Sequence, residues 1–173
     1  MAPIRICLTG PESTGKTWLA TEMAVGFGTT FVPEYARQYA QATPRPLDAT
    51  DVEPIARGEI ALLDAPAAGN LLILDTDLIS TVVYGTHYYG SCPDWIVQEA
   101  LRRRADYYFL LDVDTPFADD AVRDGTQDRH ELLNRFRDTL VEFEARFELV
   151  GGTWEARRAR VFERCGVLLS GEY

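Results

Sequence analysis

The sequence predicts an α/β fold, a three-layer sandwich in which helices cover both faces of a mainly parallel, five-stranded sheet. Short apolar runs bounded by glycine, proline and asparagine alternate with helical periodicity along the 173 residues. The run at residues 71–74 is apolar throughout, as parallel strands buried on both faces are. Another run leads through a glycine-rich loop into a helix, an arrangement typical of phosphate-binding sites. Such a sheet binds ligands at the carboxyl ends of its strands.

The strands are expected at residues 4–8, 30–32, 71–74, 107–111 and 147–150. Helices are expected at residues 13–27, 34–40, 51–63, 77–86, 94–104, 130–146 and 153–166. Gly26 and Gly28 end the first helix, and Pro33 stops the second strand. Asp51 and Asp94 are candidate N-caps. Residues 85–93 are expected to form an aromatic-rich loop, and no repeat or linker divides the chain, so we expect one domain over residues 1–173.

The glycine-rich loop spells G-x-x-x-x-G-K-T from Gly10 to Thr17. This motif, placed between a strand and a helix, predicts a P-loop, whose backbone N–H groups face the phosphates of a nucleotide such as ATP. Lys16 would contact the β- and γ-phosphates, and the Thr17 hydroxyl would ligate Mg²⁺. The predicted fold is therefore that of a P-loop NTPase, of the nucleoside- and nucleotide-kinase type. The expected nucleotide-binding residues are Gly10, Pro11, Glu12, Ser13, Thr14, Gly15, Lys16, Thr17 and Trp18.

The basic residues strengthen this prediction. The chain has 17 of them, and Lys16 is the only lysine, the other 16 being arginine. The one exception stands where a compact ammonium on a flexible stem suits the task better than a planar guanidinium.

Composition excludes several classes of protein. The net charge of −10 argues against broad nucleic-acid binding, which depends on a basic surface. No apolar run approaches a membrane span, and the sequence enters its first strand without a signal peptide. Three cysteines without metal-binding spacing favour a reduced protein of the cytoplasm. The basic triplet at residues 102–104 is interpreted as the end of a helix, where cations suit the helix dipole.

Carboxylates follow two of the predicted strands. Asp75 ends the most apolar strand and is expected to lie beside Mg²⁺, directly or through water. Asp77 is a candidate for facing a second substrate or for capping the next helix, and one residue can do both. Glu34 follows the second strand and could orient or deprotonate an acceptor hydroxyl, with a surface position as the alternative.

Two arginines lie in the polar segment after the fourth strand. Kinases of this fold class often close an arginine-bearing lid over the transferring phosphoryl group. Arg123 and Arg129 are therefore candidate catalytic residues in a lid at about residues 114–130, with solvated surface as the alternative. With them, the expected catalytic set is Lys16, Glu34, Asp77, Arg123 and Arg129.

An aromatic cluster follows the Asp75–Asp77 pair. Tyr84, Tyr88, Tyr89 and Trp95 either fill the core or stack a planar or cationic ring of a substrate. His87 and His130, the two histidines, show no metal-ligand spacing, and neither is assigned a role.

A series of motifs in this order resembles the ribosylnicotinamide kinase domain of NadR-type proteins, a P-loop family also grouped as an AAA-like ATPase domain. Beside the P-loop, the series comprises Pro33-Glu-Tyr-Ala-Arg37, Leu74-Asp-Thr-Asp77, Tyr89-Gly-Ser-Cys-Pro93 and the segment at residues 108–116 with the later arginines. The similarity spans roughly residues 4–161. The P-loop occurs in many families, so the motifs at residues 33–37 and 74–77 are the ones that distinguish this family from other P-loop proteins.

The resemblance implies that ATP, with Mg²⁺, phosphorylates the 5′-hydroxyl of nicotinamide riboside to give nicotinamide mononucleotide. By match of motif, it places residues 10–17 at ATP and Arg123 and Arg129 in the lid. The pyridinium ring is a planar cation, which would give the aromatic cluster a use. The expected acceptor-side residues are Glu34, Tyr35, Arg37, Asp77, Tyr84, Tyr88 and Trp95, with Asp75 beside them.

NadR-type proteins commonly carry an adenylyltransferase domain with an H-x-G-H motif, which the two isolated histidines cannot supply. We therefore expect a stand-alone kinase for a small-molecule nucleoside. The alternatives are a nucleotide-hydrolysing regulatory switch and a kinase for another nucleoside. A GTPase is disfavoured because its N-K-x-D motif needs a second lysine, and an AAA+ motor because Thr76 follows Asp75 where a D-E pair is usual.

Overall fold

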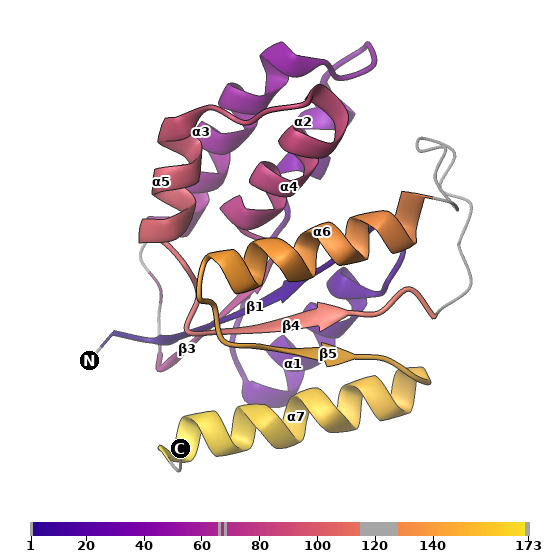
Figure 1. Cartoon of the computed structure of the whole chain (residues 1–173). Helices are drawn as coiled ribbons and strands as arrows, with labels where there is room; N and C mark the ends of the chain where they lie inside the picture. The colour runs from indigo at the N-terminus through magenta and orange to yellow at the C-terminus, as the bar shows by residue number, and fades with distance from the viewer. Residues whose placement is uncertain (1, 66, 68, 115–127, 172–173) are drawn as a thin grey trace.

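The computed structural model describes residues 2–65, 67, 69–114 and 128–171, which form a single parallel sheet covered by helices (Figure 1). The strand order is β2-β3-β1-β4-β5, and every pair of neighbours is parallel. The strands are β1 (Ile4–Thr9), β2 (Phe31–Val32), β3 (Leu71–Asp75), β4 (Tyr107–Leu111) and β5 (Phe147–Val150). The predicted five-stranded α/β fold is confirmed.

Helices lie on both faces of this sheet (Figure 1). In chain order they are α1 (Lys16–Phe27), α2 (Tyr35–Ala42), the 3₁₀ turn η1 (Ala49–Asp51), α3 (Val52–Leu63), α4 (Leu78–Tyr89), α5 (Asp94–Arg102), α6 (Asp128–Glu142) and α7 (Trp154–Ser170). Helices α1 and α7 cover one face, and α3, α4, α5 and α6 cover the other. None of the helices in the described part of the chain is long and apolar enough to span a membrane.

Alternation along β1 explains the three layers. Cys7 packs among the side chains of α3 to α6, whereas Ile6 and Leu8 pack among those of α1 and α7. Successive side chains of a strand point to opposite faces, so a strand buried on both faces supplies two cores. The same alternation holds in β4, where Tyr108 and Phe109 belong to different cores and are both fully buried.

Several predicted boundaries are wrong, and the backbone conformation at the observed helix ends explains those of α1, α4 and α7. The first helix begins at Lys16 and not at Ser13, because Ser13 and Gly15 have φ values of 56° and 90°, outside the helical region. Helix α4 continues through Gly85 to Tyr89 and ends at Gly90, whose φ is 81°. The aromatic residues expected in a loop therefore lie on this helix. Helix α7 likewise passes Gly166 and ends at Gly171.

A fully buried ring joins α6 to the sheet, and its removal tests the larger core. Phe136 is completely buried in the core beneath α3 to α6, so Phe136→Ala is expected to lower the free energy of unfolding by about 3–5 kcal/mol. Urea denaturation measures this loss. Val141→Ala, an exposed position on the same helix, is the control and should change stability by less than about 0.5 kcal/mol. Similar small losses in both variants would contradict the described packing of α6.

Candidate active site

The P-loop connects β1 to α1 through backbone conformations that favour glycine. Gly10 and Gly15 have φ values of 127° and 90°. A Cβ atom on Gly10 would lie 2.9 Å from the carbonyl oxygen of Leu111, so the loop passes directly against the end of β4. Lys16 is almost fully buried, and its Nζ donates hydrogen bonds to the carbonyl oxygens of Gly10 (2.9 Å) and Pro11 (2.6 Å). The loop therefore holds a cation where phosphate oxygens would bind.

Thr17 and Asp75 form the second part of the site. The Thr17 hydroxyl donates a 2.6 Å hydrogen bond to Oδ2 of Asp75, whereas Oδ1 is buried without a hydrogen-bond partner. Burial raises the pKa of the Asp75 carboxyl above its ordinary value. A buried oxygen without a partner is costly, and a cation would relieve that cost.

These two residues fit Mg²⁺. Within the described residues, no three histidine, cysteine, aspartate or glutamate side chains come together to hold a metal by themselves. Magnesium keeps several water ligands and often takes only one or two protein groups beside the phosphates of its nucleotide. A hydroxyl and a carboxylate at the mouth of a P-loop are therefore a sufficient protein contribution.

Asp77 lies at the start of α4, where both of its oxygens accept hydrogen bonds from the protein. Oδ1 accepts from the backbone N–H of Ile79 (3.0 Å), and Oδ2 accepts from the Tyr108 hydroxyl (2.6 Å). Burial raises its pKa to about 6. Asp77 thus caps α4, one of the two predicted roles, and its role toward a second substrate stays a prediction.

Glu34 precedes α2, and its carboxylate is more accessible than that of Asp77. Its side chain is 10% exposed and accepts a 3.3 Å hydrogen bond from Nε of Arg37, which is largely exposed. Glu34 has the N-cap position but makes no side-chain capping bond to α2. Its carboxylate therefore takes no part in capping α2, and its role toward an acceptor hydroxyl stays a prediction.

Glu59 performs the capping that Glu34 does not, and sequence reasoning missed it. This residue of α3 is buried, and its Oε2 accepts a 3.3 Å hydrogen bond from the backbone N–H of Tyr35. Burial, reinforced by the charges of Asp77, Glu34 and Asp75, raises its pKa to about 8. Sequence offered one signal, since Glu59 lies on the otherwise apolar face of a helix.

The preceding residue also positions the start of α2. A Cβ atom on Gly58 would lie 2.0 Å from the ring of Tyr35, so this ring packs directly on the backbone of α3. Gly58 and Glu59 together therefore fix the first turn of α2, which carries two of the predicted acceptor-side residues.

Arg129 lies in the first turn of α6 and contacts the P-loop. One of its guanidinium nitrogens donates a 3.3 Å hydrogen bond to the carbonyl oxygen of Ser13, and burial lowers its pKa. Glu12 of the same loop accepts a 2.8 Å hydrogen bond from the Tyr84 hydroxyl. The loop is thus joined to both α6 and α4. Arg123, the other predicted lid arginine, lies outside the described residues.

The aromatic residues predicted to stack a substrate ring lie in two environments. Tyr84 and Tyr88 are stacked one helical turn apart on α4, with ring centroids at 5.9 Å and planes at 6°. Trp95 is half-buried against the core beneath α3 to α6, and the guanidinium of Arg57 lies 4.7 Å from its ring centroid. Trp95 therefore already binds one cation of the protein.

Two further residues that sequence reasoning missed support the P-loop from α7. Arg157 is fully buried and donates hydrogen bonds to the carbonyl oxygens of Thr14 (3.3 Å), Gly152 (3.0 Å) and Asp112 (3.2 Å), with Asp114 as its ionic partner. The ring of Trp154 lies on Gly15, where a Cβ atom would be 2.3 Å away. Their sequence context resembles that of any arginine-rich amphipathic helix, so it gave no signal.

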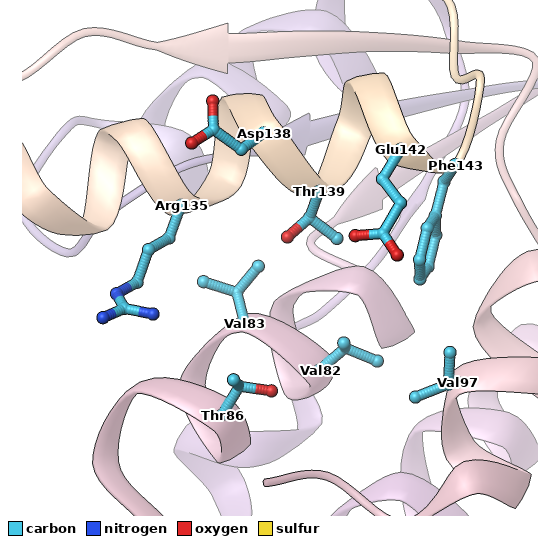
Figure 2. A pocket seen from close by; sticks show the side chains of 9 residues that line it. All are labelled: Val82, Val83, Thr86, Val97, Arg135, Asp138, Thr139, Glu142 and Phe143. Atoms are coloured by element: carbon cyan, nitrogen blue, oxygen red, sulfur yellow. The ribbon is translucent and has the colours of Figure 1, made fainter. Parts of the chain in front are cut away.

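A separate cavity of about 340 Å³ lies between α4, α5 and α6 (Figure 2). Valines of α4 and α5 and the ring of Phe143 form its apolar part, whereas polar and charged side chains of α6 line the side opposite the valines (Figure 2). Its lining residues are Val82, Val83, Thr86, Val97, Arg135, Asp138, Thr139, Glu142 and Phe143. None of them was predicted for the site.

The fold and the glycine-rich loop define a protein of the P-loop NTPase class. A family model described as an AAA domain matches residues 5–157, and the chain belongs to that family. The chain is 28% identical over 145 residues to the trifunctional NAD biosynthesis/regulator protein NadR of Escherichia coli (strain K12), which covers 79% of this chain and 35% of the relative. The protein of that name from Salmonella typhimurium (strain LT2) matches with the same identity and coverage. The chain thus spans about a third of the length of these curated relatives, and the predicted resemblance is confirmed.

Solved structures show the same fold. A crystal structure of NadR in complex with NR superposes with a TM-score of 0.75 at 24% identity, covering 93% of this chain and 50% of that one. Thymidylate kinase from Ehrlichia chaffeensis gives a TM-score of 0.70 at 13% identity, covering 96% and 100%. The expected kinase-type P-loop sandwich is therefore confirmed.

Glu59 gives a test of the acidic environment around the site. Its pKa is 4.5 ordinarily and about 8 in the folded protein, so the folded state binds one more proton between these values. Stability must then fall as the pH rises through this window. Glu59→Gln removes that dependence. Between pH 5 and 8, the free energy of unfolding of the wild type should therefore fall relative to that of the variant.

Urea denaturation at pH 5, 6.5 and 8 measures this difference, which can reach about 1.4 kcal/mol per pH unit. Glu53→Gln, an exposed position on the same helix, is the matched control and should run parallel to the wild type. A Glu59→Gln curve that also runs parallel to the wild type would show that Glu59 is ionised throughout.

Proposed function

We propose that this protein is an ATP-dependent small-molecule kinase that phosphorylates the 5′-hydroxyl of nicotinamide riboside, giving nicotinamide mononucleotide. The observation that carries the proposal is the Thr17–Asp75 hydrogen bond beside the P-loop, with further carboxylates at the neighbouring strand ends. A phosphate cradle alone fits any nucleotide-hydrolysing protein, whereas carboxylates beyond the metal position fit the activation of an acceptor hydroxyl. The name of the Escherichia coli relative, an NAD biosynthesis protein, agrees with this substrate.

The reaction transfers one phosphoryl group in line. The acceptor oxygen attacks the γ-phosphorus, the bond to the β–γ bridging oxygen breaks, and ADP leaves with that electron pair. Glu34 is the carboxylate we assign to accept the hydroxyl proton, because Asp77 is buried with both oxygens already hydrogen-bonded. Lys16 and Arg129 would neutralise charge on the phosphates, and Arg123 would join them from a lid at about residues 114–130. Thr17 and Asp75 would hold Mg²⁺, which would supply positive charge to stabilise the transferring phosphoryl group.

The acceptor side is acidic, which suits a cationic substrate. Glu34 follows β2, whereas Asp75 ends the adjacent strand β3 and Asp77 follows it. Arg37 pairs with Glu34. The pyridinium of nicotinamide riboside carries a positive charge that such a pocket attracts.

We also place the enzyme in the cytoplasm, acting without nucleic acid, since its cysteines are free and its charge is strongly negative.

A nucleoside panel tests the function. With ATP and Mg²⁺, ADP release is expected to be fastest with nicotinamide riboside, compared with adenosine, uridine, cytidine, thymidine and dTMP. Reduced nicotinamide riboside, which has the same shape without the ring charge, is the matched control and should have a kcat/KM at least about ten-fold lower. Slow hydrolysis unchanged by every compound would instead favour a regulatory switch, and a faster rate with another acceptor would make it a kinase for that compound.

Two carboxylate variants identify the base. Glu34→Gln is expected to lower kcat by about 10²–10⁴-fold, the usual range for loss of a general base, with ATP affinity unchanged. Asp77→Asn keeps an N-capping side chain for α4 and should have the smaller effect. Single-turnover rates and ATP dissociation constants measure both. A larger loss of kcat in Asp77→Asn than in Glu34→Gln would identify Asp77 as the base. A loss of ATP affinity in either variant would place the substituted residue on the nucleotide side of the site.

A further inference from the structure

Two tryptophans lie exposed at the mouth of the P-loop. Trp18, in the first turn of α1, is 40% exposed, and Trp154, the first residue of α7, is 43% exposed. Their rings meet edge to face, with centroids 5.3 Å apart and planes at 61°. Large aromatic side chains are normally buried, so two that share an open position require an explanation.

Trp154 is fixed to the P-loop. Its ring packs on Gly15, where any side chain atom would collide with it. One turn along α7, the buried guanidinium of Arg157 lies 5.7 Å from the centroid of that ring and donates a hydrogen bond to Thr14 of the loop. The ring therefore has a defined position relative to the loop, while much of its surface stays open.

We propose that Trp18 and Trp154 form a stacking platform for the base of the donor nucleotide. This inference rests on the proposed nucleotide site. The ribose and base of a nucleotide extend from the phosphates bound in the loop, and they would lie near the first turn of α1. Aromatic rings there offer flat apolar surface to the base, and stacking of this kind strengthens binding substantially.

The platform predicts how the donor is selected. Stacking involves the face of the base and not the hydrogen-bonding groups on its edge, so it tolerates a change of base. Purines offer more surface than pyrimidines. The platform should therefore bind ATP and GTP with affinities within a few-fold of each other, and both more tightly than CTP or UTP.

Binding measurements on Trp154→Ala and Trp154→Phe test the platform. Titration calorimetry with a non-hydrolysable ATP analogue should show affinity about ten-fold weaker for Trp154→Ala and within about three-fold of wild type for Trp154→Phe. Inorganic tripolyphosphate carries the phosphates without a base, so Trp154→Ala should weaken its binding much less than it weakens binding of the analogue. Leu149→Ala, an exposed position on β5, is the control and should bind both ligands as the wild type does.

Three results would overturn the proposal. An equal loss for tripolyphosphate would mean that Trp154 only supports the P-loop, and an unchanged affinity for the analogue would mean that the base lies elsewhere. If Trp154→Ala does not fold, Trp18→Ala replaces it, and unchanged analogue binding in that variant would count equally against the platform. All measurements are made without an acceptor, so the platform can stand even where the proposed kinase activity fails.

Discussion

The site depends on the parallel pairing of β1 with strands on both of its sides. Leu8 pairs with Asp75 of β3, and Thr9 pairs with Leu110 of β4. Because parallel strands end at the same edge, the loop that follows β1 lies between the ends of its two neighbours. The backbone N–H of Thr76 donates a 3.0 Å hydrogen bond to the carbonyl oxygen of Leu8, which extends the pairing to the residue after Asp75. The phosphate loop and its carboxylate are thus neighbours by topology.

Buried polar residues hold the loop and the acceptor side in place. Arg157 would be costly inside the protein without acceptors, and it has three backbone carbonyl oxygens and the Asp114 carboxylate. It thereby joins the P-loop to the segments that follow β4 and β5. Glu59 of α3 likewise joins its helix to the start of α2, by accepting a hydrogen bond from the backbone N–H of Tyr35. Both residues act on the site through other groups, which explains why they carry no motif.

Local chemistry made much of this arrangement predictable from the sequence. The P-loop, the Thr17–Asp75 pair beside it and the five strands depend on short patterns, namely glycine spacing, apolar runs and an acid at a strand end. Glu59, Arg157 and Trp154 depend on packing between elements far apart in the chain, which no local pattern encodes. The capping role of Asp77 was predictable from its local position. Its hydrogen bond to Tyr108 was not, because it joins residues 31 positions apart.

The fate of the γ-phosphate shows most directly whether the P-loop and the carboxylates form one transfer site. ATP labelled at the γ-phosphate is incubated with the protein, Mg²⁺ and nicotinamide riboside, and the label is followed by chromatography. We expect label in nicotinamide mononucleotide, one equivalent for each ADP formed. Label found only in inorganic phosphate, at a rate that the nucleoside does not change, would contradict it.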